Sequence, residues 1–233
     1  MIRNAFHRLK EQALAESTRE YKARGILVKR CNGCQLNPEL CICALQPNLS
    51  TNIDFILIYH RDEIFKPSNT GRLIADTFPQ NTYAFCWNRK TPPPELLSLL
   101  NDKERRCVIV YPAESSESRR INSSIEQQEN KRLTLILLDA TWRQSRRMYN
   151  FSQWLKDFEV LKINPARKSH YLSRNAADDS YLSTAESAGL ALSSCGQEHT
   201  AKKLFDYFYL FNQRYSMMRS NHKLSSAQLD KKQ

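Results

Sequence analysis

The sequence predicts an α/β domain built on a mostly parallel sheet. Short apolar segments with the length of strands alternate along the chain with longer segments typical of helices. These short segments are apolar nearly throughout, as expected for parallel strands that are covered on both faces. Polar clusters follow three of them, after Tyr59, Tyr111 and Leu138. In open parallel sheets, ligands bind beyond the carboxyl ends of strands, so this edge is where we expect a site.

Each element is predicted from its local pattern. The predicted strands are 53–59, 83–87, 107–111, 133–139 and 158–165. The predicted helices are 4–24, a helix beginning at Ser68 or Asn69, a helix opened by the prolines of 91–100, and the segments 141–155, 182–195 and 201–218. The Ser-rich segment 113–130 is expected to be a surface loop or a short exposed helix.

Charge and hydropathy limit the class of protein. Lys and Arg number 35 against 24 Asp and Glu, which gives a net charge of +11. Such an excess favours a nucleic-acid partner over an anionic membrane surface or a role in solubility alone. No apolar run approaches the roughly 20 residues of a membrane helix. The charged N-terminus lacks a secretory signal, so we expect a soluble, cytoplasmic protein without a membrane partner.

Four cysteines lie within thirteen residues and predict a metal site. They are Cys31, Cys34, Cys41 and Cys43. Zinc takes four thiolates in a closed, tetrahedral, structural site, and the spacing of the first pair is typical of a zinc knuckle. Crowded cysteines in a reducing compartment favour metal over disulfides. Free thiols, a redox pair and an iron–sulfur cluster are the alternatives.

Four short polar segments, read together with the cysteines, indicate a family. The segments are SNTGR at 68–72, YPAE at 111–114, DATW at 139–142 and STAE at 183–186. In this order, behind four cysteines, they resemble the DTW-domain family of tRNA-uridine aminocarboxypropyltransferases. The D-x-T-W signature stands here as Asp139, Thr141 and Trp142. The resemblance covers roughly residues 28–215.

The resemblance implies a reaction and a fold. Such enzymes transfer the 3-amino-3-carboxypropyl group of S-adenosylmethionine to N3 of a tRNA uridine, typically the variable-loop uridine at position forty-seven. The products are acp3U and methylthioadenosine. The family looks related to SPOUT-type methyltransferases, which implies a SPOUT-like, knotted α/β core. An S-adenosylmethionine-dependent RNA methyltransferase and a non-catalytic zinc-containing RNA-binding protein are the rival functions.

Asp139 is the central candidate for catalysis. It ends the clearest buried strand, where an unpaired carboxylate is costly. It could simply cap the next helix, although Thr141 and Gln144 offer an alternative capping box. With the resemblance, we expect Asp139 to accept the N3 proton or to orient the uracil, with a raised pKa if it is the base. Thr141 and Trp142 complete the predicted catalytic set.

The other residues of the four polar segments, and the arginines that follow Trp142, are predicted to bind either the RNA or the S-adenosylmethionine donor. Trp142 could stack on the uracil or be a core tryptophan. Arg143, Arg146 and Arg147 share one helix face, a phosphate track or an ordinary solvated face. Arg72 is expected to pair with the donor carboxylate or an RNA phosphate. The predicted donor-binding residues are Ser68, Asn69, Thr70, Gly71, Tyr111, Pro112, Glu114, Leu138, Ser183, Thr184 and Glu186, of which Ser183 and Glu186 also read as a capping box.

The predicted organisation has four parts. An N-terminal helix occupies 1–27, a zinc-binding element 28–50, the catalytic domain 51–219 and a disordered tail 220–233. The expected partner is tRNA, and no obligate protein partner is inferred.

Overall fold

The structure is a computed structural model, and it describes most of the chain. The described residues are 2–17, 29–111, 121–122, 125, 130–163 and 182–219. Pro112, Glu114, most of the predicted loop 113–130 and the predicted tail 220–233 lie outside them.

A six-stranded sheet forms the centre of the molecule. Its strands are β1 (Asp54–Tyr59), β2 (Thr82–Cys86), β3 (Arg105–Val110), β4 (Ile121–Asn122), β5 (Arg132–Asp139) and β6 (Glu159–Leu161). Their order is β2-β1-β5-β3-β6-β4, and every pairing is parallel. The predicted α/β class and all five predicted strands are confirmed. Strand β6 is shorter than predicted, and β4 lies in the segment predicted to be a loop or an exposed helix.

Seven α-helices are present among the described residues. They are α1 (Ala5–Ala15), α2 (Arg61–Ile64), α3 (Gly71–Thr77), α4 (Pro94–Leu100), α5 (Trp142–Phe151), α6 (Thr184–Ser194) and α7 (Glu198–Arg219). Short 3-10 turns lie at Pro38–Leu40, Cys43–Leu45 and Gln153–Leu155. The short helix α2 was not predicted. Helix α3 begins at Gly71, later than predicted, and the Asn69 side chain before it accepts from the N–H of Arg72 in the first turn.

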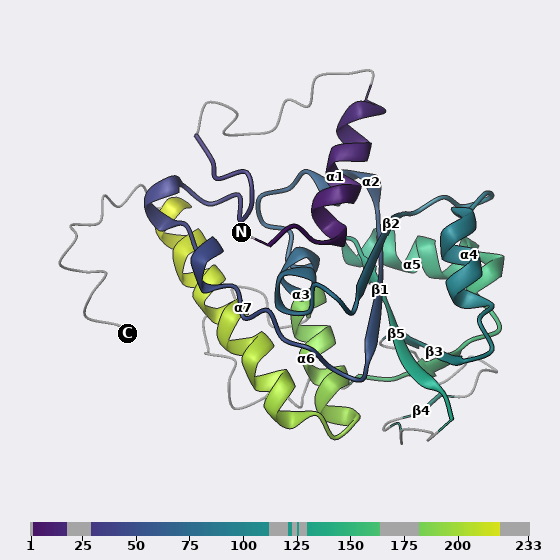
Figure 1. The fold of residues 1–233 in the computed structure, drawn as a ribbon. Helices are drawn as coiled ribbons and strands as arrows, with labels where there is room; N and C mark the ends of the chain where they lie inside the picture. Colours follow the sequence, from purple (N-terminus) through teal and green to yellow (C-terminus); the bar gives the residue numbers. More distant parts are fainter. Residues whose placement is uncertain are drawn as a thin grey trace.

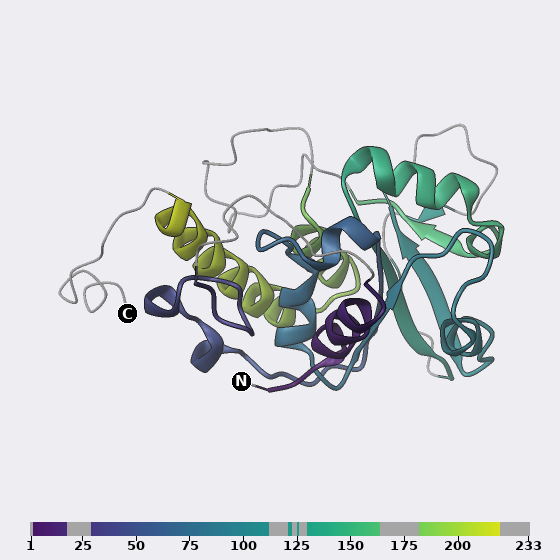
Figure 2. The same ribbon diagram turned by 90° about the horizontal axis from the view of Figure 1, so that it is seen from above.

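The helices cover the sheet on both faces (Figures 1 and 2). Apolar residues of α1, α3 and α6 pack on one face, with α7 lying outside α3 and α6. Helices α4 and α5 cover the other face. None of the described helices is long and apolar enough to cross a membrane.

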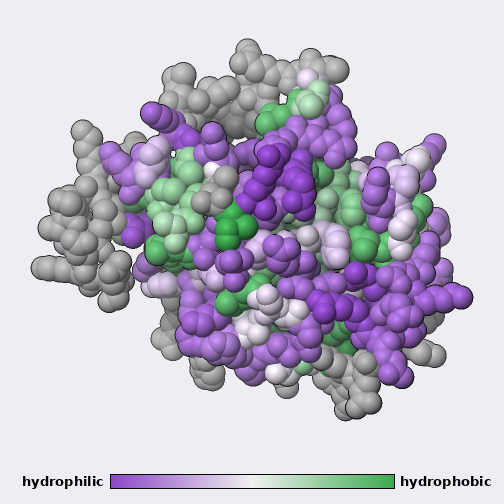
Figure 3. Space-filling model, viewed as in Figure 1, coloured by the Kyte–Doolittle hydropathy of each residue, from purple (hydrophilic) through white to green (hydrophobic). Residues whose placement is uncertain are grey.

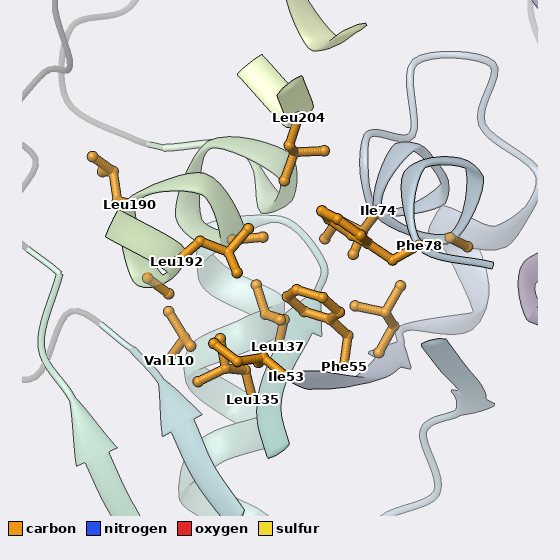
Figure 4. Close-up of a cluster of buried hydrophobic side chains, with 14 of the residues drawn as sticks. Ile53, Phe55, Ile74, Phe78, Val110, Leu135, Leu137, Leu190, Leu192 and Leu204 are labelled. Carbon is orange, nitrogen blue, oxygen red and sulfur yellow. The ribbon is translucent and has the colours of Figure 1, made fainter. Parts of the chain in front are cut away.

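Strand β1 shows why its sequence is continuously apolar. Phe55 and Leu57 point into the core beneath α3 and α6, whereas Ile56 and Ile58 point into the core beneath α4 and α5. All six residues of the strand are buried, so the period of two is hidden in the sequence. Figure 4 shows the core beneath α3 and α6, where Phe55 and Leu137 of the sheet and Ile74 of α3 belong to one buried cluster.

The cysteine segment packs beside α7 rather than on the sheet (Figure 1). Leu36, Leu40 and Ile42 join an apolar cluster with Phe208 and Phe211 of α7. Hydrophilic side chains cover most of the face seen in Figure 3, and apolar residues appear there in separate patches. The knot implied by the family resemblance stays a prediction, since the connections 112–120 and 164–181 lie outside the described residues.

Candidate active site and metal centre

The two central strands end on a facing pair of residues. Tyr59, the last residue of β1, is the register partner of Asp139, the last residue of β5. Both are buried, and the Tyr59 ring belongs to the core beneath α3 and α6. Partners in register point to the same face of a sheet, so both side chains are directed toward the start of α3.

Only one oxygen of the buried Asp139 carboxylate accepts a hydrogen bond of ordinary geometry from the described residues. Its side chain is 2% exposed, and the amide Nδ2 of Asn69 donates to Oδ1 at 2.5 Å. Among the described residues, Oδ2 and the hydroxyl of Tyr59 have no hydrogen-bond partner of ordinary geometry. Buried polar atoms in native proteins are nearly always satisfied, so two neighbouring unpaired oxygens indicate a place where a bound molecule supplies the partners.

Gly71 makes this arrangement possible. A Cβ built at Gly71 would lie 2.1 Å from Oδ2 of Asp139 and 3.0 Å from the Tyr59 hydroxyl oxygen. Only a residue without a side chain fits at the first position of α3. Gly71, which was predicted to bind the donor, therefore lies directly against the Asp139 carboxylate.

Burial, helped by the negative charge of Glu63, raises the pKa of Asp139 to about 7. Hydrogen bonds from the Thr184 side chain, the Asn69 amide and the Gly71 N–H oppose the shift. A carboxyl group with a pKa near neutrality can exchange a proton at physiological pH, as a general base requires. The raised pKa was expected if Asp139 is the base.

Asp139 does not cap the helix that follows it. Thr141 is the N-cap of α5, and its hydroxyl accepts from the N–H of Gln144 at 3.4 Å. The Gln144 side chain accepts in return from the N–H of Thr141 at 3.0 Å. The capping box offered as the alternative is therefore confirmed, and it leaves the Asp139 carboxylate available for another role.

The start of α6 closes the same corner of the sheet. Ser183 caps α6 in a capping box with Glu186, as the sequence pattern indicated. The N–H of Ala185 donates a long hydrogen bond of 3.5 Å to the hydroxyl oxygen of Thr70. Since Thr184 also acts on the pKa of Asp139, the structure brings the loop before α3, the end of β5 and the start of α6 together.

Tyr111 and Trp142 form a second group on the α5 side of this sheet edge. Their rings stack with centroids 5.9 Å apart, and Tyr149 stacks on Tyr111 at 4.2 Å. Trp142 is 37% exposed, so it is not a core tryptophan. Leu138 also packs on this side, opposite to the side chain of Asp139. Ser68 is exposed in the loop before α3.

Helix α5 presents its arginines to solvent. Arg143, Arg146 and Arg147 are exposed, while Met148 and Tyr149 on the inner face are buried. The shared face that the spacing predicted is present, and it lies next to the aromatic group of Tyr111 and Trp142.

The placement of Arg72 differs from the prediction. Its side chain is 1% exposed, and the guanidinium lies over the ring of Phe211 in α7, 4.7 Å from the centroid. An RNA phosphate cannot reach it there. The prediction paired Arg72 with the donor carboxylate or an RNA phosphate, but the first turn of α3 directs this side chain into the interior between α3 and α7.

Two residues near Asp139 were missed in the sequence analysis. The charge of Glu63 raises the pKa of the Asp139 carboxyl, whereas burial and the charge of Asp139 raise the pKa of Tyr59. Tyr59 carried a signal, since it is a polar-tipped residue at the carboxyl end of a buried strand. Glu63 carried none, because its burial depends on the packing of α2.

The four cysteines converge to form a candidate metal centre. Their sulfur atoms all lie within 4.8 Å of one another, and the Cys31–Cys41, Cys31–Cys43 and Cys34–Cys41 distances are 3.5, 3.6 and 3.7 Å. A tetrahedron with metal–sulfur bonds of about 2.3 Å has edges of about 3.8 Å. The set therefore fits a single tetrahedral ion. These distances are too long for a disulfide.

Comparison with known proteins agrees with this architecture. The sequence profile of the DTW domain matches residues 28–216, from the cysteine segment to the last turn of α7. The chain belongs to the DTW domain family. This DTW domain is 25% identical over 170 residues to "tRNA-uridine aminocarboxypropyltransferase 2" of Macaca fascicularis. The match covers 70% of this chain and 55% of that protein, so the chain spans about half the length of the relative. No solved structure gives a significant match.

Proposed function

We propose that this DTW domain is a tRNA-uridine aminocarboxypropyltransferase. It would transfer the 3-amino-3-carboxypropyl group of S-adenosylmethionine to N3 of a tRNA uridine, giving acp3U and methylthioadenosine. The variable-loop uridine at position forty-seven is the proposed target. Family membership, the named relative and the basic charge of the chain support this assignment.

The observation that carries the proposal is the Asp139 carboxylate at the end of β5. It is buried, its Oδ2 has no hydrogen-bond partner of ordinary geometry among the described residues, and its pKa is raised to about 7. Uridine N3 carries a proton that must leave when N3 becomes a nucleophile. A neutral-pH base in a site with little water is the group this step needs.

The proposed reaction is an in-line displacement. The N3–carbon bond forms as the carbon–sulfur bond of the sulfonium breaks, and the bonding electrons leave with the sulfur of methylthioadenosine. Oδ2 of Asp139 takes the N3 proton and returns it to solvent after release. The donor is already activated, so the main task of the protein is to hold the reacting atoms close and aligned.

The donor side of the site is proposed at the corner where α3 and α6 begin. The loop 68–71 and the residues Ser183 and Thr184 frame Asp139 there, with Thr70 bonded to the α6 backbone. Tyr111, Pro112, Glu114, Leu138 and Glu186 complete the set proposed from the family pattern, although Leu138 presents its side chain to the opposite face.

The RNA side is proposed on the α5 side of the same edge. The half-exposed Trp142, backed by Tyr111, offers a stacking surface for a base. Arg143, Arg146 and Arg147 continue from it as a basic stripe for phosphates. We further propose a structural zinc at the cysteines, a SPOUT-like knotted core, the four-part organisation of the chain and a cytoplasmic location.

One incubation tests the function. Purified full-length protein, S-adenosylmethionine and unmodified tRNA are combined, and the nucleosides and the small product are identified by mass spectrometry. We expect acp3U with methylthioadenosine. S-adenosylhomocysteine with a methylated base would identify the methyltransferase rival instead. Failure of the donor to bind in calorimetry would favour the non-catalytic RNA-binding rival.

A further inference from the structure

Arg72 is a buried cation for which the fold supplies no hydrogen-bond partner. None of its three guanidinium nitrogens, Nε, Nη1 and Nη2, has one among the described residues. Arginine stays protonated in proteins, so this charge cannot be removed by titration. A buried charge left without compensation costs several kcal/mol or more, so an anionic group must lie near it.

The described surroundings of Arg72 contain two kinds of anionic group. The guanidinium lies over Phe211, which belongs to the apolar cluster that contains Cys34 and against which Cys31 and Cys43 pack. Burial lowers the pKa of Arg72, and the Asp76 carboxylate and the sulfurs of Cys34 and Cys43 are among the groups that oppose that shift. The cysteine sulfurs therefore lie within electrostatic reach of the guanidinium.

Asp76 is already occupied by other donors. Its Oδ1 accepts from Asn4 at 2.8 Å and from Gln46 at 2.9 Å, and its Oδ2 accepts from Tyr207 at 3.4 Å. No ion pair between Arg72 and Asp76 is formed in the part of the chain that the structure describes. The larger negative charge is the metal centre, because a divalent ion bound by four thiolates carries a net charge of −2.

The backbone of Arg72 is tied to the other site. Its N–H donates to Oδ1 of Asn69 at 3.0 Å, and the amide of the same Asn69 donates to Asp139. Gly71, the preceding residue, is the one that lies against the Asp139 carboxylate. A single residue thus faces the cysteines with its side chain and the Asp139 corner with its backbone.

We propose that Arg72 is a positioning residue that supplies the buried counter-charge of the four-cysteine metal site and thereby fixes the first turn of α3 against Asp139. Metal binding stabilises the guanidinium, and the guanidinium lowers the repulsion among the thiolates. Groups that contact metal ligands from outside act in this way, and their removal typically weakens metal binding by roughly 10- to 100-fold. The first turn of α3 would then connect the four-cysteine site with the corner around Asp139.

Zinc affinity of the full-length chain tests the charge role. Zn²⁺ is titrated against a colorimetric chelator for the wild type, Arg72→Met and Arg72→Lys. We expect Arg72→Met to weaken binding by roughly 10- to 100-fold and Arg72→Lys to lose less. Arg105→Met is the matched control, since Arg105 is also largely buried but pairs with Asp54 at the opposite edge of the sheet. Equal affinities of folded Arg72→Met and wild type would overturn the proposal.

Asp76→Asn keeps the test decisive if Arg72→Met does not fold. Removing a negative charge beside Arg72 leaves its positive charge to act on the thiolates alone, so zinc affinity is expected to stay equal or to rise. A clear fall in affinity would show that Asp76, not the metal centre, is the partner of Arg72, and would sink the proposal.

Hydrogen exchange tests the link to α3. Zinc loading is expected to slow amide exchange at residues 71–74 in the wild type and in Arg105→Met, and to slow it less in Arg72→Lys. Equal exchange with and without zinc in the wild type would remove the link. Neither measurement uses the donor or tRNA, so both outcomes stand whether or not the proposed transfer occurs.

Discussion

Gly71 lies directly against the carboxylate of Asp139, with no room for a side chain between them. A Cβ at Gly71 would stand 2.1 Å from Oδ2, well inside contact distance. The contact joins the first residue of α3 to the last residue of β5, and it fixes where the candidate base lies relative to the donor loop.

Gly71→Ala is therefore expected to reduce transfer by roughly 100-fold or more, because a displacement of about 1 Å at a reacting group has that effect. Gly189→Ala is the matched control, since its Cβ would also meet a side chain, Phe205, at 2.4 Å, but in the interface of α6 and α7. Thermal unfolding and single-turnover rates are compared for both. Equal rates per folded molecule in the two variants would contradict the assigned role of Gly71.

Asp139→Asn is expected to abolish transfer and to change how stability depends on pH. The folded pKa is about 7, above the unfolded value, so the folded protein keeps the proton between about pH 4 and 7 while the unfolded chain loses it. Wild-type stability therefore falls as pH rises through this window, by up to roughly 4 kcal/mol, and the variant lacks this slope. Urea unfolding from pH 4.5 to 8 measures both slopes, and parallel curves would rule out the raised pKa.

The rate of transfer by the wild type is expected to rise with pH and to level off above about pH 7, because only the ionised carboxylate accepts the N3 proton. Single-turnover rates at saturating donor and tRNA give the profile. A rate that does not change between pH 5.5 and 8 would exclude Asp139 as the base.

Thr141 is predicted to stabilise the protein by capping the N-terminus of α5. Thr141→Ala is expected to lower the free energy of unfolding by about 1 kcal/mol, whereas Thr141→Ser keeps the hydroxyl and loses little. Transfer by Thr141→Ala, measured per folded molecule, should fall far less than in Asp139→Asn. A comparable fall would give the hydroxyl a direct part in the chemistry.

The arginines of α5 are predicted to bind phosphates. Each of Arg146→Gln and Arg147→Gln is expected to weaken tRNA binding and to lower the slope of log K against log salt by about 0.7 to 0.9. Lys202→Gln is the control, since Lys202 is exposed on α7 and pairs with Asp206 within its own helix. If both arginine variants show the same salt dependence as the wild type, the exposed face of α5 does not contact phosphates.

Local pattern explains which features the sequence could predict. The five apolar strands, the prolines that open α4 and the capping boxes of Thr141 and Ser183 each depend on residues a few positions apart. The clustering of the four cysteines belongs here too, because their spacing in the chain limits how far apart the sulfurs can be. Such short-range rules are fixed by backbone geometry and need no knowledge of the fold.

The remaining features required the tertiary structure. Asn69 reaches Asp139 across 70 positions, and Tyr59 becomes its neighbour only through the pairing of β1 with β5. Arg72 was predicted to pair with the donor carboxylate or an RNA phosphate, and it is buried because α7 packs over α3. The sequence alone determined the five apolar strands, the longer helices, the signature and the clustering of the four cysteines. Packing between distant segments decided which polar atoms lost their water. That loss raises the pKa of Asp139 and leaves the buried guanidinium of Arg72 without a hydrogen-bond partner among the described residues.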